Sequence, residues 1–334
     1  MRRYLARLSG GMQRNWFWLC LVAVLLAASG SGLAHAQNYP TKTVTLISDA
    51  GVGGSPDVTT RLVAEGLSKL WGQQVIVLNK PGANGSIAAR AAAEATPDGY
   101  TLFVPSLSTF VASPTVAPNL PVKVPRDFLP IGFTADQPMF ITISPAVPAD
   151  TLAQFIALAK QEPGKLSVAV SGVGRLTHLT SELLQNRAGI RLTSIPYTKG
   201  MSNALADAAS GRVSLVIENF AAVIGGVKGG QLKLLAVASA ERLPDFPNVP
   251  TVAETLPGLA ATGWQAVLAP KGTPEPVVKK ISADLAQVVS GAEFKKKMAA
   301  LGGYPRAMTP EQVQAFIAKE QDTWLPIVQK VSTK

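Results

Sequence analysis

SDAGVGGSPDVTTRLVAE, residues 48–65, places three glycines between an apolar run and a helical pattern. The run VTLI at 44–47 predicts a short buried strand. Ser55 and Pro56 suit a helix start, because serine caps free N–H groups and proline tolerates the first helical position. Apolar residues then recur at helical spacing up to Leu70. The loop therefore presents backbone N–H groups and the positive end of a helix dipole, which predicts an anion site.

The same alternation of strands and helices continues along the chain. In the first half the pattern predicts a helix at 56–70, a strand at 74–79, a helix at 87–95 and a strand at 100–104. After a proline-rich passage at 114–130, a new strand begins at Phe140 and the alternation restarts. The helices predicted in this half are 151–160, 176–188, 201–209 and a short one near 221. The strands that alternate with them are 166–170, 191–195, 213–217 and 232–237. From Trp264 onward three amphipathic helical segments end near Val331. This order predicts an α/β protein in which two halves with parallel strands face each other across a cleft.

The N-terminal segment has the pattern of an export signal. Four arginines precede the apolar run WFWLCLVAVLLAA at 16–28, and Ala34-His35-Ala36 fits a signal-peptidase site. The run is shorter than the ~20 residues that a membrane-spanning helix needs. We therefore predict a signal peptide at 1–36 that is cleaved after Ala36 and a periplasmic chain that begins at Gln37. An uncleaved N-terminal anchor is the alternative.

Charge and cysteine content limit the partners. Cys20 lies in the leader and is the only cysteine, so the exported chain has no disulfide. The leader holds four of the 31 basic residues and none of the 21 acidic ones, which leaves 27 against 21, a net charge of +6. Such a field favours anionic solutes. Nucleic-acid binding is not predicted, because no basic residues alternate with aromatics, and the lysines at 295–297 are interpreted as a solvated helix face.

The glycine loop does not fit a nucleotide. A dinucleotide fingerprint starting at Gly51 would need a third glycine where Pro56 stands and an acid where the second strand ends in Asn79 and Lys80. No Gly-Lys-Ser/Thr ending is present either. The loops PSLST at 105–109, SGVGRLTHL at 171–179 and PYTKG at 196–200 also follow strands. Their hydroxyl and N–H groups predict a site for a small carboxylate rather than a phosphate chain.

Catalysis is not predicted. His178 is the only histidine of the exported chain, and Ser171 lies in AVSGV, which is not a nucleophile elbow. Neither cysteines nor a carboxylate cluster offers a metal site, so we expect no metal, no cofactor and no enzyme. An exported hydrolase that uses Ser171 and His178 stays open as an alternative. Glu218 and Asn219 end a strand, where they would meet a ligand amine or hydroxyl, or else cap the next helix.

Five motifs carry a resemblance to a known family; they are LNKPGANGSIAARAAAEATPDGYTL, AKQEPGKLSVAVSGVGRLTHLTSELL, IPYTKG, ERLPDFPNVPTVAETLPG and LAPKGTPEPVV. In this order they resemble the solute receptors of tripartite tricarboxylate transport systems, the Bug receptors. The resemblance implies a two-domain periplasmic binding protein of type II topology, with one domain at 37–139 and 264–334 and the other at 140–263. It implies a monomer that binds a small organic acid between its domains and passes it to integral membrane permease subunits. A receptor of this fold that signals to a sensor protein is the alternative.

Carried over by position, the resemblance implies that the ligand contacts residues of both halves; these are Ala50, Gly51, Val52, Gly53, Gly54, Ser55, Asp57, Ser106, Ser108, Thr109, Ser171, Gly172, Gly174, Thr177, His178, Tyr197, Glu218 and Asn219. Two loops depart from the family pattern, because the Asp49 loop and the Thr198 loop each have one extra residue. Asp49 would bring a negative charge toward the carboxylate site. The departures therefore predict a solute that is less acidic, larger or amine-bearing.

Overall fold

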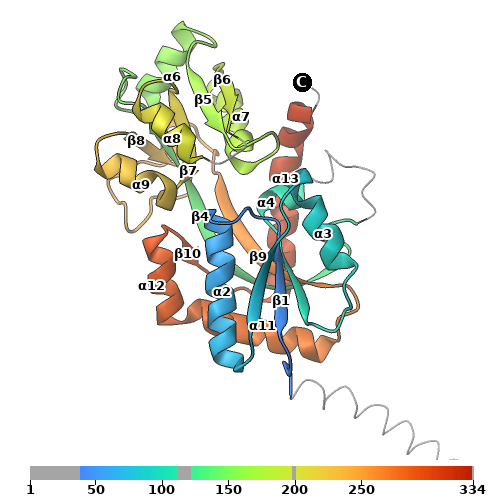
Figure 1. Cartoon of the computed structure of the whole chain (residues 1–334). Helices are drawn as coiled ribbons and strands as arrows, with labels where there is room; N and C mark the ends of the chain where they lie inside the picture. Colours follow the sequence, from blue (N-terminus) through green and yellow to red (C-terminus); the bar gives the residue numbers. More distant parts are fainter. Residues whose placement is uncertain (1–37, 112–121, 198–200, 333–334) are drawn as a thin grey trace, which may run out of the picture.

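The computed structural model describes residues 38–111, 122–197 and 201–332, with side chains described up to residue 329 (Figure 1). The predicted leader with its cleavage site, and residues 198–200 of the PYTKG loop, lie outside these ranges. The described strands are β1 (Val44–Ser48), β2 (Val75–Asn79), β3 (Thr101–Val104), β4 (Phe128–Ile143), β5 (Ser167–Val170), β6 (Thr193–Pro196), β7 (Leu215–Asn219), β8 (Lys233–Val237), β9 (Thr262–Pro270) and β10 (Tyr304–Pro305). The helices are α2 (Ser55–Trp71), η1 (Ala83–Gly85), α3 (Ser86–Ala93), α4 (Leu107–Val111), α6 (Leu152–Gln161), α7 (Leu176–Ala188), α8 (Ser202–Ala209), α9 (Phe220–Lys228), α10 (Val252–Thr255), α11 (Glu275–Ser290), α12 (Ala292–Ala300) and α13 (Pro310–Ser332).

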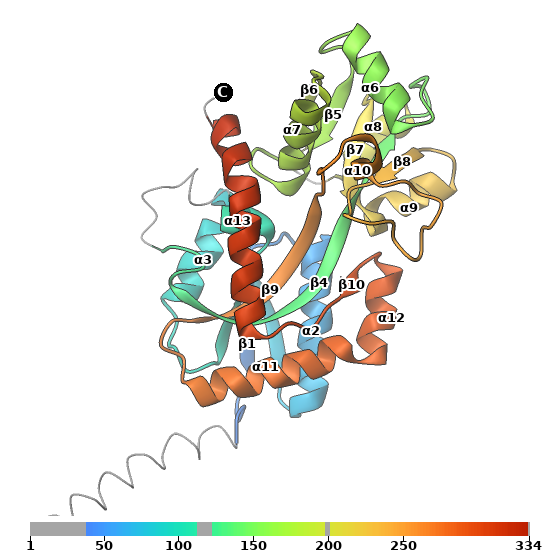
Figure 2. The ribbon, with the colours of Figure 1, turned by 180° about the vertical axis from the view of Figure 1, so that it is seen from behind.

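Strand β4 connects two parts of one mixed sheet, whose order is β2-β1-β3-β9-β4-β7-β5-β6. Residues 128–138 of β4 pair antiparallel with β9, whereas residues 139–143 pair antiparallel with β7. We call the elements around the first part of β4 the first lobe and those around its second part the second lobe. The chain enters the second lobe along β4 and returns along β9, so α11, α12 and α13 pack on the first lobe (Figure 2).

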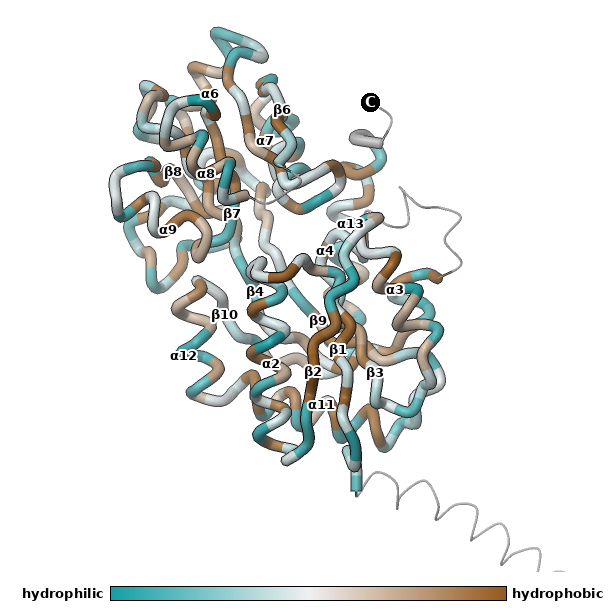
Figure 3. The backbone as a smooth tube through the Cα atoms, viewed as in Figure 1, coloured by the Kyte–Doolittle hydropathy of each residue, from teal (hydrophilic) through white to brown (hydrophobic). Residues whose placement is uncertain are grey.

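The first lobe has three layers, because its parallel strands β1 and β3 are buried on both faces, whereas Ile76 and Leu78 of the edge strand β2 are exposed. One face packs against α2, α11 and α12 through residues such as Leu46, Leu67 and Ile281. The other face packs against α3, α4 and α13 through residues such as Phe103 and Trp324. Figure 3 shows the concentration of apolar residues along β1 and β2. Burial on both faces fixes the strand ends, and with them the loops that follow β1 and β3.

The second lobe repeats this arrangement. Strands β5, β6 and β7 pair in parallel, and β8 pairs with β4. Helices α6, α7 and α10 cover one face with residues such as Phe155 and Leu184, while α8 and α9 cover the other with Ala208 and Val223. The loops after β5, β6 and β7 therefore lie at one edge of the sheet, as expected for parallel strands.

The two lobes also touch away from β4 and β9. Gly302, after α12, has φ +64°, and a Cβ atom there would lie 2.2 Å from the Cβ of Phe220 at the start of α9. The hydroxyl of Tyr304 donates to Asp245 at 3.2 Å. Helix α13 contacts α7 on the opposite side. These contacts define how closely the second lobe approaches the first.

The fold class predicted from the sequence is confirmed, and so are the strands and helices of the alternating pattern. Two predictions about strands were wrong. The strand expected to begin at Phe140 begins at Phe128. Pro130, the last residue of the passage described as proline-rich, lies inside β4, and so does Pro138. The segment beginning at Trp264 forms β9 before any helix, and β9 and β4 run antiparallel to each other. Helices α4 and α10 were not predicted.

Candidate functional site

A cavity of about 820 Å³ lies between the lobes. Its wall comes from the loop after β1 and the start of α2, the loop after β3, the start of α7, Tyr197 after β6, and the junction of β7 and α9. Thirteen of the predicted site residues line it: Ala50, Gly51, Val52, Gly53, Gly54, Ser55, Ser106, Ser108, Ser171, Thr177, Tyr197, Glu218 and Asn219. The convergence follows from the topology, because each group sits at the carboxyl end of a parallel strand.

Five predicted residues do not line the cavity: Asp57, Thr109, Gly172, Gly174 and His178. Asp57 lies beneath the glycine loop, where it accepts hydrogen bonds from Gly53 N–H at 2.9 Å and from Asn79 Nδ2 at 2.8 Å. It also pairs with Arg61 at 3.0 Å. Burial by itself would raise the pKa of Asp57, but these three donors outweigh it and the pKa is lowered. Asp57 therefore shapes the loop from within, and its carboxylate faces away from the cavity wall.

Asp49 also points away from the cavity, contrary to the expectation that it brings charge toward the ligand. Its side chain is fully buried and accepts hydrogen bonds from the backbone N–H and hydroxyl of Ser106, and from the hydroxyl of Thr109. This network joins the end of β1 to the start of α4. It also explains why Thr109 does not line the cavity, since its hydroxyl is used on Asp49. The predicted preference for a less acidic solute is thus not supported by Asp49.

The first turn of α2 supplies unpaired donors to the cavity. Gly54 is the N-cap residue, and no side chain caps the helix. The N–H groups of a first helical turn have no intrahelical acceptor, and the dipole makes them favourable partners for an anion. The hydroxyl oxygen of Ser55 is buried and has no partner among the described residues. Ser55 lines the cavity, so an anion at this helix end would meet N–H groups that have no acceptor within the helix, next to this buried hydroxyl.

The loop after β5 contributes hydroxyl groups and a cation. Thr177 Oγ1 lies 2.8 Å from both the backbone nitrogen and the hydroxyl of Ser171, which holds the loop against the start of α7. Arg175 is the N-cap residue of α7, lines the cavity, and has no side-chain hydrogen bond or ion pair within the described residues. Gly172 and Gly174 have φ values of +134° and +77°, so they supply the turn rather than the wall.

His178 belongs to the interior of this loop. Its Nδ1 accepts a hydrogen bond from Gly174 N–H at 3.2 Å, and its Nε2 lies 4.0 Å from the carboxylate of Glu182. The side chain is 8 % exposed and does not line the cavity. The hydroxyl of Ser171 pairs with Thr177 instead. These contacts are those of a structural histidine, so the geometry gives no support to a Ser171–His178 nucleophile pair.

Glu218 and Asn219 do two different things at the end of β7. Asn219 caps α9, because its side-chain oxygen accepts from Ala222 N–H, and it also lines the cavity. Glu218 Oε2 accepts from the backbone N–H and the side-chain Nδ2 of Asn219, both at 3.0 Å. Burial raises the pKa of Glu218 to about 7, while the Asn219 N–H and the charge of Arg175 oppose the rise.

Tyr197 was predicted to contact the ligand and lines the cavity. Its hydroxyl donates to Asp207 at 2.5 Å, so its ring rather than its hydroxyl is available to a ligand.

Several wall residues were not singled out from the sequence. Gln137, Trp264 and Leu301 also line the cavity. Trp264 is 2 % exposed and its indole donates to Glu320 at 2.8 Å. No local signal marks these residues, because they reach the wall from β4, β9 and the end of α12. Arg175 carried a signal, since it stands inside the predicted loop SGVGRLTHL.

Comparison with known proteins identifies the family. The model of the tripartite tricarboxylate transporter family receptor matches residues 59–333. The chain belongs to this receptor family. Protein BugT of Bordetella pertussis is 34% identical over 319 residues, which cover 95% of this chain and 98% of BugT. The family is one of receptors and not of enzymes.

Solved structures of similar chains agree with this membership. The chain is similar to a protein of R. palustris determined with adipate, at 31% identity and a TM-score of 0.80, covering 88% of this chain and 98% of the other. The periplasmic binding protein BugD gives 30% identity and a TM-score of 0.77, with 88% and 99% covered. MatC from Rhodopseudomonas palustris with bound malate has 28% sequence identity and a TM-score of 0.76, and the match covers 87% of this chain and 100% of MatC.

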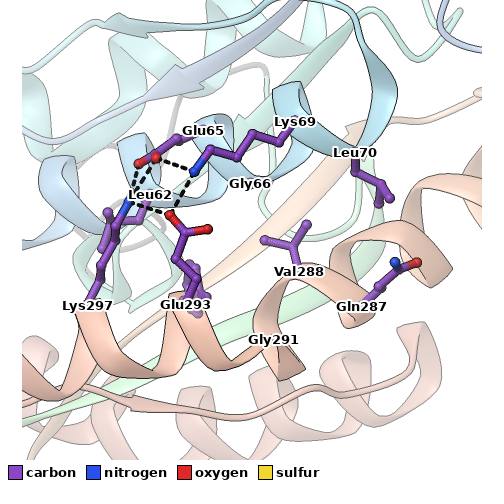
Figure 4. Close-up of a pocket in the computed structure, with 11 residues that line it drawn as sticks. Leu62, Glu65, Gly66, Lys69, Leu70, Gln287, Val288, Gly291, Glu293 and Lys297 are labelled. Carbon is purple, nitrogen blue, oxygen red and sulfur yellow. Dashed lines mark hydrogen bonds and ion pairs between the residues drawn. The ribbon is translucent and has the colours of Figure 1, made fainter.

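A second, smaller cavity of about 300 Å³ lies between α2, α11 and α12 (Figure 4). Its four charged residues pair with one another: Lys297 contacts Glu65 at 2.8 Å, and Lys69 contacts Glu293 at 2.7 Å. Lys297 and Lys69 lower the pKa of Glu65 to about 2. Lys295 and Lys296 are exposed as predicted, but Lys297 joins α12 to α2. With its charges already neutralised, this cavity is a weaker candidate for a receptor's ligand.

The part of the chain that the structure describes has neither a candidate membrane span nor a cluster of metal-ligand side chains. Within it, no helix is both long and apolar enough to cross a membrane. Nor do three histidine, cysteine, aspartate or glutamate side chains gather there as metal ligands would. The large cavity is therefore the feature from which function is best argued.

Proposed function

We propose that this chain is an exported receptor that captures a small organic acid in the cavity between its lobes and delivers it to membrane permease subunits. The observation that carries the proposal is the composition of the cavity wall. The open N-terminus of α2 with Ser55, and Arg175 with its unpaired guanidinium, line one space, and the hydroxyl of Ser55 lies buried and unpaired beside it. Such donors stabilise an anion by charge-assisted hydrogen bonds. Family relatives with adipate and with malate support the class of ligand.

Further parts of the proposal concern the whole protein. We propose cleavage after Ala36, a periplasmic monomer, and domains at 37–139 with 264–334 and at 140–263. The change of pairing partner along β4 between residues 138 and 139 supports these boundaries. We also propose that the protein binds without transforming its ligand, because the wall presents binding groups and neither Ser171 nor His178 is placed for catalysis. Ligand between the lobes would stabilise the closed form that a permease recognises.

Thermal unfolding tests the binding function. Residues 37–334 are unfolded, freed of any carried solute, refolded, and screened against organic acids, amino acids, neutral sugars and nucleotides. A ligand at 100 times its dissociation constant adds about 2.7 kcal/mol of stability, which gives a clear rise in melting temperature. We expect a rise with one class of organic acids. A rise with sugars or nucleotides alone would contradict the proposal.

A matched pair of variants locates the binding. Arg175→Ala removes the wall cation, whereas Arg187→Ala removes an exposed arginine from the last turn of the same helix. We expect Arg175→Ala to weaken binding of the organic acid by about tenfold or more, the effect of a hydrogen bond to a charged group. Arg187→Ala should leave it unchanged. Equal affinities for the two variants would place the ligand elsewhere.

A further inference from the structure

The charges on the wall of the large cavity are unusual for a site that takes an anion. Among the described residues that line it, Arg175 is the only cation and Glu218 the only anion. No ion pair joins them within 4.0 Å, although the charge of Arg175 lowers the pKa of Glu218. The wall therefore presents one guanidinium and one carboxyl group that do not pair with each other.

Arg175 is available to a ligand. It precedes α7, and its side chain makes no hydrogen bond or ion pair with the described residues. A guanidinium binds a carboxylate through two parallel hydrogen bonds, and the N-terminus of α7 adds a favourable dipole beside it. One carboxylate of a solute therefore has a partner at this end of the cavity.

Of the two carboxylate oxygens of Glu218, one accepts hydrogen bonds within the protein and the other is available to a donor from the solute. Two hydrogen bonds from Asn219 hold Oε2, and no described residue donates to Oε1. A carboxylate removed from water without donors is costly, which is why its pKa rises to about 7. A donor supplied by the solute would offset that cost, and a positively charged donor would offset it most. A second carboxylate placed there would meet like charge whenever Glu218 is ionised, whereas an ammonium group would favour the ionised form.

We infer that the cavity selects a zwitterionic organic acid, whose carboxylate pairs with Arg175 and whose ammonium group donates to Oε1 of Glu218. The inference rests on the proposed function and names its solute class. Glu218 is then the residue that distinguishes an amino acid from a dicarboxylic acid. The buried Asp49 plays no part in this selection, since Ser106 and Thr109 occupy its oxygens.

Pairs of probes with equal carbon number test the inference by isothermal titration calorimetry on refolded residues 37–334. The pairs are β-alanine with malonate, γ-aminobutyrate with succinate, and ε-aminocaproate with adipate. We expect the amino acid of at least one pair to bind about tenfold more tightly than its dicarboxylate, the effect of about 1.4 kcal/mol. In Glu218→Gln that preference should disappear, while dicarboxylate binding is kept or strengthened.

Two controls make the result decisive. Glu162→Gln changes an exposed glutamate of the second lobe, whose partner is Lys165, and should leave every affinity unchanged. Melting temperatures without ligand show that each variant is folded. Tighter binding of the dicarboxylate in every pair, with no change of ratio in Glu218→Gln, overturns the inference and leaves the receptor function standing. Absence of binding in both series overturns the inference together with the small-acid function.

Discussion

Ser106 donates two hydrogen bonds to the carboxylate of Asp49, one from its backbone N–H at 3.1 Å and one from its hydroxyl at 2.8 Å. Asp49 is fully buried, and Thr109 donates a further hydrogen bond to it. The carboxylate of Asp49 therefore lies inside the first lobe and not in the cavity. Its effect is to join the first glycine loop to the loop after β3, so that both hold a fixed position on the wall.

The first prediction concerns Asp49→Ala. The substitution leaves the N–H of Ser106 and the hydroxyl of Thr109 without their acceptor, and removing a buried charged partner costs about 3 kcal/mol. Urea unfolding should show a decrease of this order in the free energy of unfolding. Asp150→Ala is the control, because Asp150 is 80% exposed and pairs with Lys233 at the surface. A loss in Asp49→Ala no greater than in the control would show that the network contributes no stability.

The second prediction concerns Ser55→Ala. Because the hydroxyl of Ser55 is buried without a partner, its removal should not lower the stability of the free protein. It should weaken ligand binding by about five- to tenfold, the value of one hydrogen bond. Ser68→Ala is the matched control in the same helix, because its hydroxyl donates to Ala64 O and accepts from Val75 N–H. That variant should lose stability and keep affinity; the same response in both variants would contradict the assignment.

The third prediction concerns Gly302→Ala. A methyl group there would lie 2.2 Å from Cβ of Phe220, at a residue with φ +64°. Gly258→Ala separates the two causes, because Gly258 has φ +78° but nothing within 4 Å of the added atom. Gly258→Ala should cost about 1 kcal/mol from backbone conformation alone. Gly302→Ala should cost more and also weaken ligand binding, since it forces the lobes apart. Equal losses would mean that the Phe220 contact is not retained in solution.

The fourth prediction concerns the pH dependence that Glu218 confers. Burial raises its pKa from 4.5 to about 7, so the folded state holds this proton more strongly than the unfolded state. Between these values the free energy of unfolding should therefore fall as the pH rises, by an amount on the order of 3 kcal/mol. The charge of Arg175 already keeps this pKa below the value that burial alone would give. The free energy of unfolding should be measured by urea unfolding at a pH below 4.5 and at a pH above 7. We expect the difference between the two values to be smaller for Glu218→Gln than for the unchanged protein. Unchanged slopes would exclude a buried carboxyl group here.

Much of the fold could be predicted because the signals were local. The strand at 44–47 and the helix from 56 carry their own apolar periodicity and their own start signals. Strand β4 could not be predicted in full, because its partner β9 lies more than a hundred residues later and Pro130 and Pro138 resemble loop signals. A proline is compatible with a strand where its missing N–H is not needed for pairing. That condition depends on the tertiary structure.

The candidate site, too, was predictable where the signal is local and not where it depends on the tertiary structure. The sequence placed the glycine loop, Ser171 and Glu218 at strand ends, and the topology brings those ends together. It could not tell which way each side chain turns, so Asp57, Thr109 and His178 were assigned to the ligand although they hold the loops from inside. Trp264 and Gln137 were not predicted as site residues. An apolar or amide side chain on a strand has the same sequence pattern whether it lines a cavity or lies in the core.

The path of β4 through both lobes sets the mechanics of closure. Within the described residues, the chain passes between the lobes along β4 and along the segment entering β9, and Met139 N–H donates to Ala261 O where the two run side by side. A rotation of one lobe must be absorbed by a few backbone torsions in this pair of adjacent strands. For the receptor function proposed above, these two adjacent strands would serve as the hinge, and the shape offered to a membrane partner would change by a rotation about them. In such a receptor, the bound and free states would differ in the angle between the lobes and not in the flexibility of their connection.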